Sequence, residues 1–162
     1  MDDIIFRPIG IIHTPYSEPK GVPIQPNRGK DVEATIEIFD EYVEGLADLD
    51  GFSHIILLFH LHKSTGYKMK VVPFLDDTVR GLFSTRAPRR PNPIGLSIVR
   101  LTSIERNILH IKDIDIVDGT PLLDIKPHVP NFDESENFRI GWLEDKVKRP
   151  SARKNADDRF EE

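Results

Sequence analysis

The sequence predicts a mainly β fold built from many short strands, of the sandwich or barrel type. The first observation is an alternation of apolar and polar residues over 32–38, the period-2 pattern of a strand with one buried face. The second is the short spacing of turn signals such as Asp50-Gly51, Arg106-Asn107 and Asp118-Gly119. Short strands separated at this pitch are typical of a sandwich or barrel.

The strands are expected in the apolar segments between these turns. The run from His54 to Leu61 is apolar at both odd and even positions, which predicts a strand buried on both faces. The residues from Asp40 to Leu49 predict a short helix with Asp40 as its N-cap, and Phe138–Leu143 predicts another. The further predicted strands are Ile4–His13, Val32–Ile38, Met69–Phe74, Gly81–Thr85, Leu96–Ile104, Ile108–Val117 and Leu122–Lys126.

Length and composition indicate one soluble domain. The chain has 162 residues and no cysteine, which excludes disulfides and thiolate chemistry. No apolar stretch is long enough to span a bilayer and the start is acidic, so a cytoplasmic location is expected. The net charge of −5 argues against a generally basic surface. From Lys146 onward the chain is charged, which predicts a domain over 1–145 and a mobile tail over 146–162.

The segment from Phe83 to Ser97 combines prolines with arginines. Its prolines and arginines are Arg86, Pro88, Arg89, Arg90, Pro91 and Pro93. Proline fixes φ, lacks an N–H donor and restricts the residue before it, so this segment is expected to be neither helix nor central strand. It predicts a stiff loop that presents guanidinium groups to an anion or a flat polar ligand.

A second cluster is Asp118-Gly119-Thr120-Pro121, followed by Asp124-Ile125-Lys126-Pro127-His128. It can be a simple hairpin turn, or a rigid turn that carries a carboxylate and a lysine to a ligand. The proline-rich segment Tyr16–Pro26 similarly reads first as an ordinary connection.

Histidines recur at His54, His60 and His62, on one face of the predicted strand. A zinc site would need three or four ligands, and no cysteine or nearby carboxylate is available, so we expect pocket or core histidines and no metal. The chain also lacks the glycine-rich loops of Rossmann and P-loop enzymes and the nucleophile elbow of α/β-hydrolases.

Several motifs together resemble the TsaA/TrmO-like family over roughly residues 5 to 132. The matching stretches are Ile9–Tyr16, Phe52-Ser53-His54, Ser84-Thr85-Arg86, Arg90–Ser97, Asp118–Pro121 and Asp124–Pro127. The resemblance implies a single-domain β-barrel with minor helices, unlike the Rossmann fold. It also implies an S-adenosylmethionine-dependent methyltransferase that acts, as a homodimer, on N6 of threonylcarbamoyl-adenosine beside the anticodon of threonine tRNA.

The resemblance also implies roles for individual residues. The cofactor would be bound by Pro23, Ile24, Gln25, His62, Lys63, Arg86, Leu96, Ile116, Val117, Asp118, Gly119 and Thr120. Asp118 or Asp124 would accept a hydrogen bond from the N6–H group or stabilise the sulfonium, and Lys126 would join them in the catalytic set. Lys126, Arg89 and Arg90 would hold the substrate carboxylate or tRNA phosphates.

Three rival interpretations stay open at this stage. The chain could be a barrel that binds S-adenosylmethionine or RNA without catalysis. It could be a metal-dependent hydrolase built on the histidines, although the ligands are few. It could also be a methyltransferase with a different nucleoside or a small molecule as acceptor.

Overall fold

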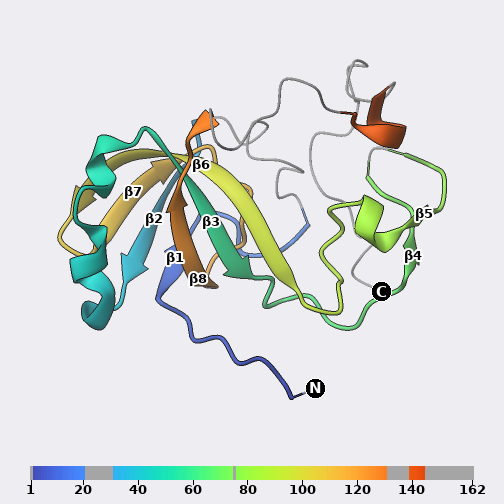
Figure 1. Cartoon of the computed structure of the whole chain (residues 1–162), viewed down its shortest axis with the longest axis horizontal. Helices are drawn as coiled ribbons and strands as arrows, with labels where there is room; N and C mark the ends of the chain where they lie inside the picture. Colours follow the sequence, from blue (N-terminus) through green and yellow to red (C-terminus); the bar gives the residue numbers. More distant parts are fainter. Residues whose placement is uncertain (1, 21–30, 75, 131–138, 145–162) are drawn as a thin grey trace.

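In the computed structural model, which describes residues 2–20, 31–74, 76–130 and 139–144, six antiparallel strands close into a barrel (Figure 1). They are β1 (Gly10–His13), β2 (Glu33–Ile38), β3 (His54–His60), β6 (Ile94–Glu105), β7 (Ile108–Lys112) and β8 (Thr120–Pro127). Around the barrel the order is β1-β2-β7-β6-β3-β8, and β8 pairs with β1 to close it. The expectation of a mainly β barrel is confirmed.

The barrel closes tightly around β1. Gly10 stands opposite both Ile38 of β2 and Leu122 of β8. A Cβ atom at this position would lie 2.3 Å from the backbone oxygen of Glu37, so only glycine permits this approach.

The hydrophobic core fills the barrel with side chains from alternate positions. On β2 the buried residues are Ala34, Ile36 and Ile38, as the alternation predicts. On β3 only the odd positions are buried, and Ile56 and Leu58 are half-exposed on the outer face. The prediction of a strand buried on both faces was therefore wrong. In a closed barrel one face of each strand points to the core and the other points outward, so β3 has only one buried face.

Several predicted strands are shorter in the structure. The residues Ile4, Ile5 and Phe6 are 76%, 85% and 62% exposed, and β1 begins only at Gly10. The predicted strands Met69–Phe74 and Gly81–Thr85 are reduced to the small sheet of β4 (Lys70–Val71) and β5 (Arg80–Gly81). Apolar composition alone did not distinguish these loops from strands, because an extended loop can carry the same side chains.

The helices that the structure describes are short 3-10 segments. The region predicted as a helix over Asp40–Leu49 contains η2 (Asp40–Leu46) and the start of η3 (Leu49–Gly51), and η5 (Gly141–Leu143) lies in the second predicted helix. The helix η4 (Leu82–Ser84) was not predicted, since the sequence indicated a strand over Gly81–Thr85. Phe39, not Asp40, is the N-cap of η2, and it makes no side-chain capping bond. Phe138 and the predicted tail over 146–162 lie outside the described residues. Within the described ranges, no helix has the length and apolar character needed to cross a membrane.

The β4–β5 sheet and the loop after it are held by a network around Arg80. Its guanidinium binds the buried carboxylate of Asp76 at 2.6 Å and lies over the ring of Trp142, 5.1 Å from the centroid. The indole N–H of Trp142 donates in turn to the backbone oxygen of Ser84. This network fixes the start of the proline-arginine segment to β5 and η5.

Candidate functional site

The barrel wall opens where β6 extends beyond β7. Strand β6 begins at Ile94, but β7 pairs only with its second half, from Arg100 to Glu105. β7 ends at Lys112, and Asp113 then adopts a left-handed conformation with φ of 67°. The predicted strand Ile108–Val117 is thus cut short at Lys112 because the chain turns at Asp113. The first half of β6 consequently has no β7 neighbour.

Arg100 fixes this turn. Its guanidinium donates to the carboxylate of Asp113 at 3.1 Å and to that of Asp31 at 2.8 Å. These hydrogen bonds lock the chain at the point where it leaves β7. The segment that follows, residues 114–119, therefore diverges from β6 and does not pair with it.

The 114–119 segment is clamped to the end of β1. Ile114 and Ile116 are buried in the core, while the hydroxyl of Thr14 donates to the backbone oxygen of Ile116 at 2.8 Å. The amide of Asp118 donates to the backbone oxygen of Tyr16. Gly119 completes the turn with φ of 72°, a conformation that favours glycine. The predicted Asp-Gly turn is present, and it serves to position this segment.

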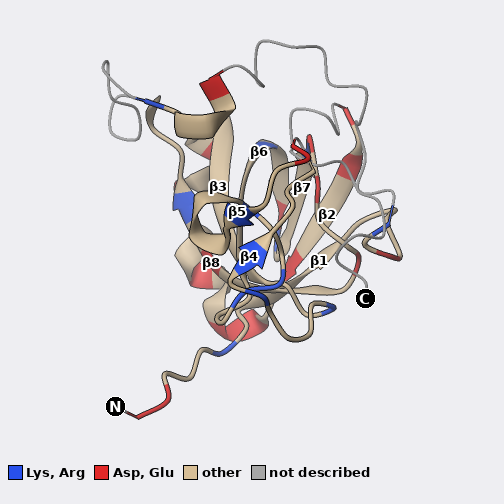
Figure 2. Cartoon of the chain, turned by 90° about the vertical axis from the view of Figure 1, so that its right-hand side faces the viewer, with Lys and Arg blue, Asp and Glu red and all other residues tan. Residues whose placement is uncertain are grey.

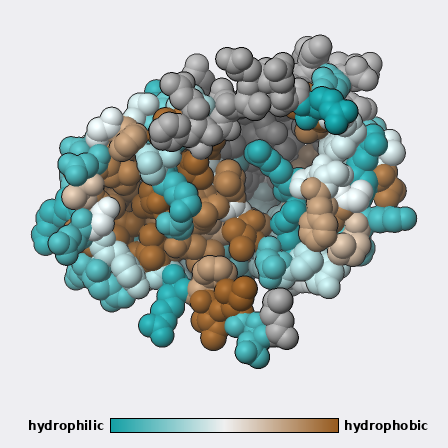
Figure 3. Space-filling model, viewed as in Figure 1, coloured by the Kyte–Doolittle hydropathy of each residue, from teal (hydrophilic) through white to brown (hydrophobic). Residues whose placement is uncertain are grey.

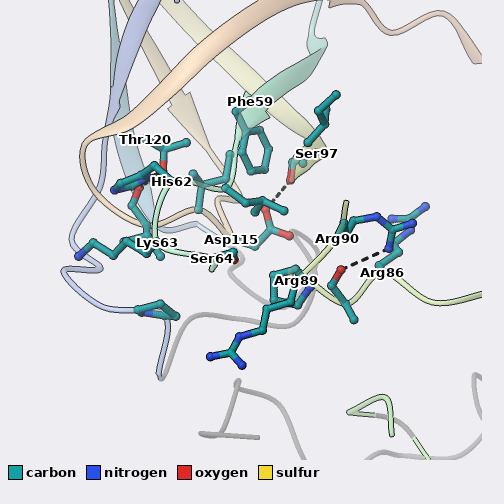
Figure 4. Close-up of a pocket in the computed structure, with 18 of the residues that line it drawn as sticks. Phe59, His62, Lys63, Ser64, Arg86, Arg89, Arg90, Ser97, Asp115 and Thr120 are labelled. Carbon is teal, nitrogen blue, oxygen red and sulfur yellow. Dashed lines mark hydrogen bonds between the residues drawn. The ribbon is translucent and has the colours of Figure 1, made fainter. Parts of the chain in front are cut away.

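A cavity of about 830 Å³ lies between β6, this segment and the proline-arginine loop (Figure 4). Its apolar walls are Phe59, Leu61, Phe74, Ala87, Ile94, Leu96 and Ile116. Its polar and charged groups come from Glu18, His62, Lys63, Ser64, Thr65, Thr85, Arg86, Arg89, Arg90, Ser97, Asp115 and Thr120. The volume suits a nucleoside-sized ligand.

Gly95 lets Phe59 form one wall of this cavity. The two residues pair across β3 and β6, and a Cβ on Gly95 would lie 2.2 Å from Cε2 of Phe59. The ring therefore packs directly on the glycine backbone. A side chain at position 95 would displace the ring from its place in this wall.

Asp115 and Ser97 form a polar pair inside the cavity. The hydroxyl of Ser97 donates to Oδ1 of Asp115 at 2.7 Å, and Figure 4 shows this carboxylate among the lining side chains. Burial raises the pKa of Asp115 to about 6, although the Ser97 hydrogen bond and the charge of Arg86 lower it in part. The carboxyl is therefore mostly ionised at neutral pH, but it is more basic than an exposed carboxylate.

His62 lines the cavity beside Thr120. Its Nδ1 lies 3.3 Å from the Thr120 hydroxyl, which also donates to the backbone oxygen of Val117 at 2.6 Å. Burial, with the charges of Lys63 and His60, lowers the pKa of His62, so the ring is neutral at pH 7. A neutral imidazole can donate or accept a hydrogen bond without bringing a charge to the ligand. The ammonium of Lys63 donates to the backbone oxygen of Ser17.

Most of this chain matches one known protein family. The family model for the tRNA-methyltransferase O N-terminal domain matches residues 11–134. The chain belongs to this family. The resemblance of the sequence to the TsaA/TrmO-like family is thereby confirmed.

Individual members of the tRNA-methyltransferase O family are also similar. A probable S-adenosyl-L-methionine-binding protein of Pyrococcus abyssi is 58% identical over 144 residues, covering 89% of this chain and 78% of that protein. A tRNA (adenine(37)-N6)-methyltransferase of Mus musculus is 35% identical, covering 85% of this chain. A crystal structure of TrmO from Pseudomonas aeruginosa is 36% identical, with a TM-score of 0.73 and 87% of this chain covered.

The chain spans only part of some family members. It covers 63% of the Pseudomonas aeruginosa TrmO chain and 34% of the Mus musculus protein. The family model covers residues 11–134, which contain most of the barrel. Membership of the tRNA-methyltransferase O family agrees with the barrel fold of this chain.

The cavity brings together many, but not all, of the residues that the resemblance implied. The lining includes His62, Lys63, Arg86, Arg89, Arg90, Leu96, Ile116, Val117 and Thr120. Asp118 and Gly119 form the adjoining turn and do not line the cavity. Pro23, Ile24 and Gln25 lie outside the described residues.

Asp124 and Lys126, by contrast, lie away from the cavity on β8. Their side chains form an ion pair of 2.7 Å with each other. Asp118 also has its own partners, because its Oδ1 accepts the Thr14 amide at 2.9 Å and lies 3.7 Å from Nδ1 of His13. The catalytic set expected from the motifs is thus spread over the turn and the strand.

The proline-arginine loop is shorter than the sequence predicted. The segment 82–84 is the helix η4, and Ile94–Ser97 belongs to β6, paired with β3. The proline rule holds only up to Pro93, since Ile94 to Ser97 contain no proline. Arg90 braces the loop: it donates to the backbone oxygens of Thr85 and Ala87 and lies over the ring of Phe83.

Sequence reasoning missed Ser97, Phe59 and Asp115 as cavity residues. Asp115 had a detectable signal, because it is a charged residue between Ile114 and Ile116 in an apolar run. Such a residue in a buried segment needs a polar partner, which Ser97 supplies from another strand. The expectation that the histidines act in a pocket fits His62, which lines the cavity. In the described ranges, no cluster of three or more His, Asp or Glu residues could hold a metal ion.

Proposed function

We propose that this chain is an S-adenosylmethionine-dependent methyltransferase that modifies N6 of an adenosine in tRNA. The observation that carries the proposal is the cavity of a TrmO-type barrel, whose lining contains both a carboxylate and an imidazole. Similarity to S-adenosyl-L-methionine-binding proteins and to tRNA (adenine(37)-N6)-methyltransferases supports both the cofactor and the acceptor.

The lining fits S-adenosylmethionine chemically. Phe59 and Leu61 offer an apolar surface for a flat base, and the cofactor's carboxylate can be met by the guanidinium of Arg86. His62 and Thr120 offer neutral hydrogen-bonding groups for hydroxyls. When bound, the cofactor supplies a methyl group on a positively charged sulfur.

The roles of the protein in this reaction are alignment and exclusion of water. The clamped 114–119 segment and the braced loop fix two walls of the cavity. Rigid walls hold a donor and an acceptor at the geometry that an in-line transfer needs. Asp118 contributes by anchoring the turn through Thr14, and we assign it this positioning role.

The acceptor that we propose is threonylcarbamoyl-adenosine beside the anticodon of threonine tRNA. This nucleoside carries a carboxylate, and tRNA carries phosphates, so cations are required around the acceptor. Figure 2 shows Lys and Arg gathered around β4 and β5 on the side that bears the cavity loop. Arg89 lines the cavity on this side, which supports a role in holding the acceptor or its phosphates. Work on tRNA also implies a cytoplasmic location.

We further propose that two chains associate as a homodimer through the outer face of β3 and β6. Ile94, Leu96 and Ile98 are 42%, 50% and 36% exposed, and they stand opposite His60, Leu58 and Ile56. Figure 3 shows hydrophobic surface over these strands. A contiguous apolar face of this kind favours association. Because Ile94 and Leu96 also line the cavity, the interface would adjoin the site.

The decisive experiment compares three RNA substrates. Labelled S-adenosylmethionine is incubated with the chain and with threonine tRNA that carries or lacks the threonylcarbamoyl group, and with an unrelated tRNA, followed by nucleoside analysis. We expect label on N6 only in the tRNA with the threonylcarbamoyl group. Transfer to all three would leave the methyltransferase but reject this acceptor, and transfer to none would reject the proposed function.

A further inference from the structure

Asp115 is a carboxylate in the cavity lining that was not among the site residues predicted from the sequence. Its neighbours Ile114 and Ile116 are 0% and 2% exposed, because both point into the core. In an extended segment the intervening side chain points the other way, and here it enters the cavity. Among the described residues, Glu18 is the one other carboxylate in the lining, and it is exposed.

The surroundings of Asp115 leave part of its carboxylate available to a ligand. Ser97 donates to Oδ1, and among the described residues no other side chain donates a hydrogen bond to this carboxylate. Arg86, on the loop before β6, acts on it through its charge, and Tyr16, after β1, faces it as the other titratable group. The carboxylate is thus oriented by one hydroxyl and keeps acceptor capacity toward the cavity.

The proposed reaction needs such an acceptor. The N6 nitrogen of threonylcarbamoyl-adenosine carries one hydrogen, and this proton must leave when the nitrogen gains a methyl group. A partly buried carboxylate with a pKa of about 6 is suited to accept it, since it is ionised at pH 7 and more basic than an exposed carboxylate. The other candidate carboxylates, Asp118 and Asp124, are engaged by Thr14 and Lys126 outside the lining.

We propose that Asp115 is a catalytic residue that accepts the hydrogen bond from the N6–H group and takes its proton, with Ser97 as a positioning residue. This inference rests on the proposed function. The nitrogen lone pair forms the new N–C bond, and the electrons of the broken C–S bond go to sulfur. The N–H electrons stay on nitrogen, and the proton passes to the Asp115 carboxylate and then to water. Atoms and charge balance without another reactant.

The test uses Asp115→Asn, which keeps the shape and removes the base. We expect single-turnover methyl transfer to threonylcarbamoyl-containing tRNA to fall by about a hundredfold or more. Equilibrium dialysis with labelled S-adenosylmethionine should give an affinity within a few-fold of the wild type. Melting curves and far-ultraviolet circular dichroism check that the variant is folded. Asp50→Asn, an exposed carboxylate on η3, is the matched control and should change neither quantity.

Ser97→Ala adds a readout that a structural role would not move. The lost hydrogen bond stabilised the ionised carboxylate, so the acid limb of the transfer rate should shift to higher pH than in the wild type. Transfer that persists in Asp115→Asn within about tenfold overturns the proposal. A parallel loss of cofactor affinity also overturns it, because the carboxylate would then bind the cofactor. A wild-type chain that methylates no tRNA rejects the proposed function itself, and the Asp115 assignment with it.

Discussion

The hydroxyl of Ser97 lies 2.7 Å from Oδ1 of Asp115 and joins β6 to a segment that makes no backbone pairing with it. Beyond the end of β7, the Ser97–Asp115 hydrogen bond therefore links β6 to the 114–119 segment in place of backbone hydrogen bonds. The opening that remains between them is the cavity. The same feature that interrupts the sheet thus creates room for a ligand and places a carboxylate in it.

Adding one methyl group at Gly95 should damage the cavity wall. In Gly95→Ala the new Cβ would lie 2.2 Å from the ring of Phe59, which must move. We expect a loss of about 1–3 kcal/mol in the free energy of unfolding from overpacking, measured by urea titration. Gly45→Ala is the matched control, because its Cβ meets nothing within 4 Å. Equal stability of both variants would show that the ring does not rest on position 95.

Stability should depend on pH through Asp115. Its pKa rises from 3.8 to about 6 on folding, so the folded chain binds a proton in this range that the unfolded chain has released. This carboxyl therefore destabilises the fold increasingly as pH rises through the range, and by a constant amount above it. Asp115→Asn removes the effect. Urea titrations should be made below pH 3.8, between pH 3.8 and about 6, and above pH 6. The free energy of unfolding of Asp115→Asn, relative to that of the wild type, should rise with pH until about pH 6 and then stay constant. A constant difference would contradict the buried position.

Removing the hydroxyl of Thr14 should loosen the 114–119 segment. Thr14→Val deletes the hydrogen bond to the backbone oxygen of Ile116, at a cost of about 1 kcal/mol. We expect faster hydrogen exchange at the amides of Asp118 and Gly119, which donate to Tyr16 and Ile12. Thr102→Val is the control. It deletes a similar hydrogen bond, from the hydroxyl of Thr102 on β6 to the backbone oxygen of His110 on β7, away from the 114–119 segment. Unchanged exchange at Asp118 would mean that the clamp does not hold the turn.

Substitution of Arg89 should change the salt dependence of tRNA binding, whereas substitution of Lys112 should not. If Arg89 contacts a phosphate, Arg89→Ala should reduce the slope of log affinity against log salt by about 0.7–0.9. Lys112→Ala is the control, because this lysine of β7 is paired with Glu33 of β2 and is not in the cavity lining. Filter binding over a range of salt concentrations measures both slopes. Equal slopes for Arg89→Ala and the wild type would exclude a phosphate contact.

A charge on the outer face of β6 should prevent association. Ile98 belongs to the exposed apolar face but not to the cavity lining. Analytical ultracentrifugation should give the wild type twice the mass of the 18.5 kDa chain, and Ile98→Glu the single mass. Ser103→Glu, at an exposed position on the same strand, should leave the dimer intact. A monomeric wild type would contradict the proposed homodimer.

The sequence predicted the barrel class and much of the cavity, and its failures have physical causes. Alternation over 32–38 identified β2 because a barrel strand has one buried face. The sequence did not predict where some strands end, because a single backbone conformation ends them. At Asp113, for example, a positive φ ends β7 although apolar and polar residues still alternate after it. Ser97 and Asp115 meet only through the register of β6 against a distant segment, which no local pattern encodes. Asp124 and Lys126 lie in a motif beside the cavity residues in sequence, yet their strand carries them away from it.

Binding of S-adenosylmethionine to the cavity is the central claim, and equilibrium dialysis with the labelled cofactor tests it most directly. We expect saturable binding of one molecule per chain in the wild type, and an affinity about tenfold lower in Gly95→Ala, because the displaced Phe59 ring alters a wall of the cavity. Gly45→Ala should bind as the wild type does. No binding at millimolar cofactor, or equal binding by Gly95→Ala, would contradict the assignment of this cavity as the cofactor site.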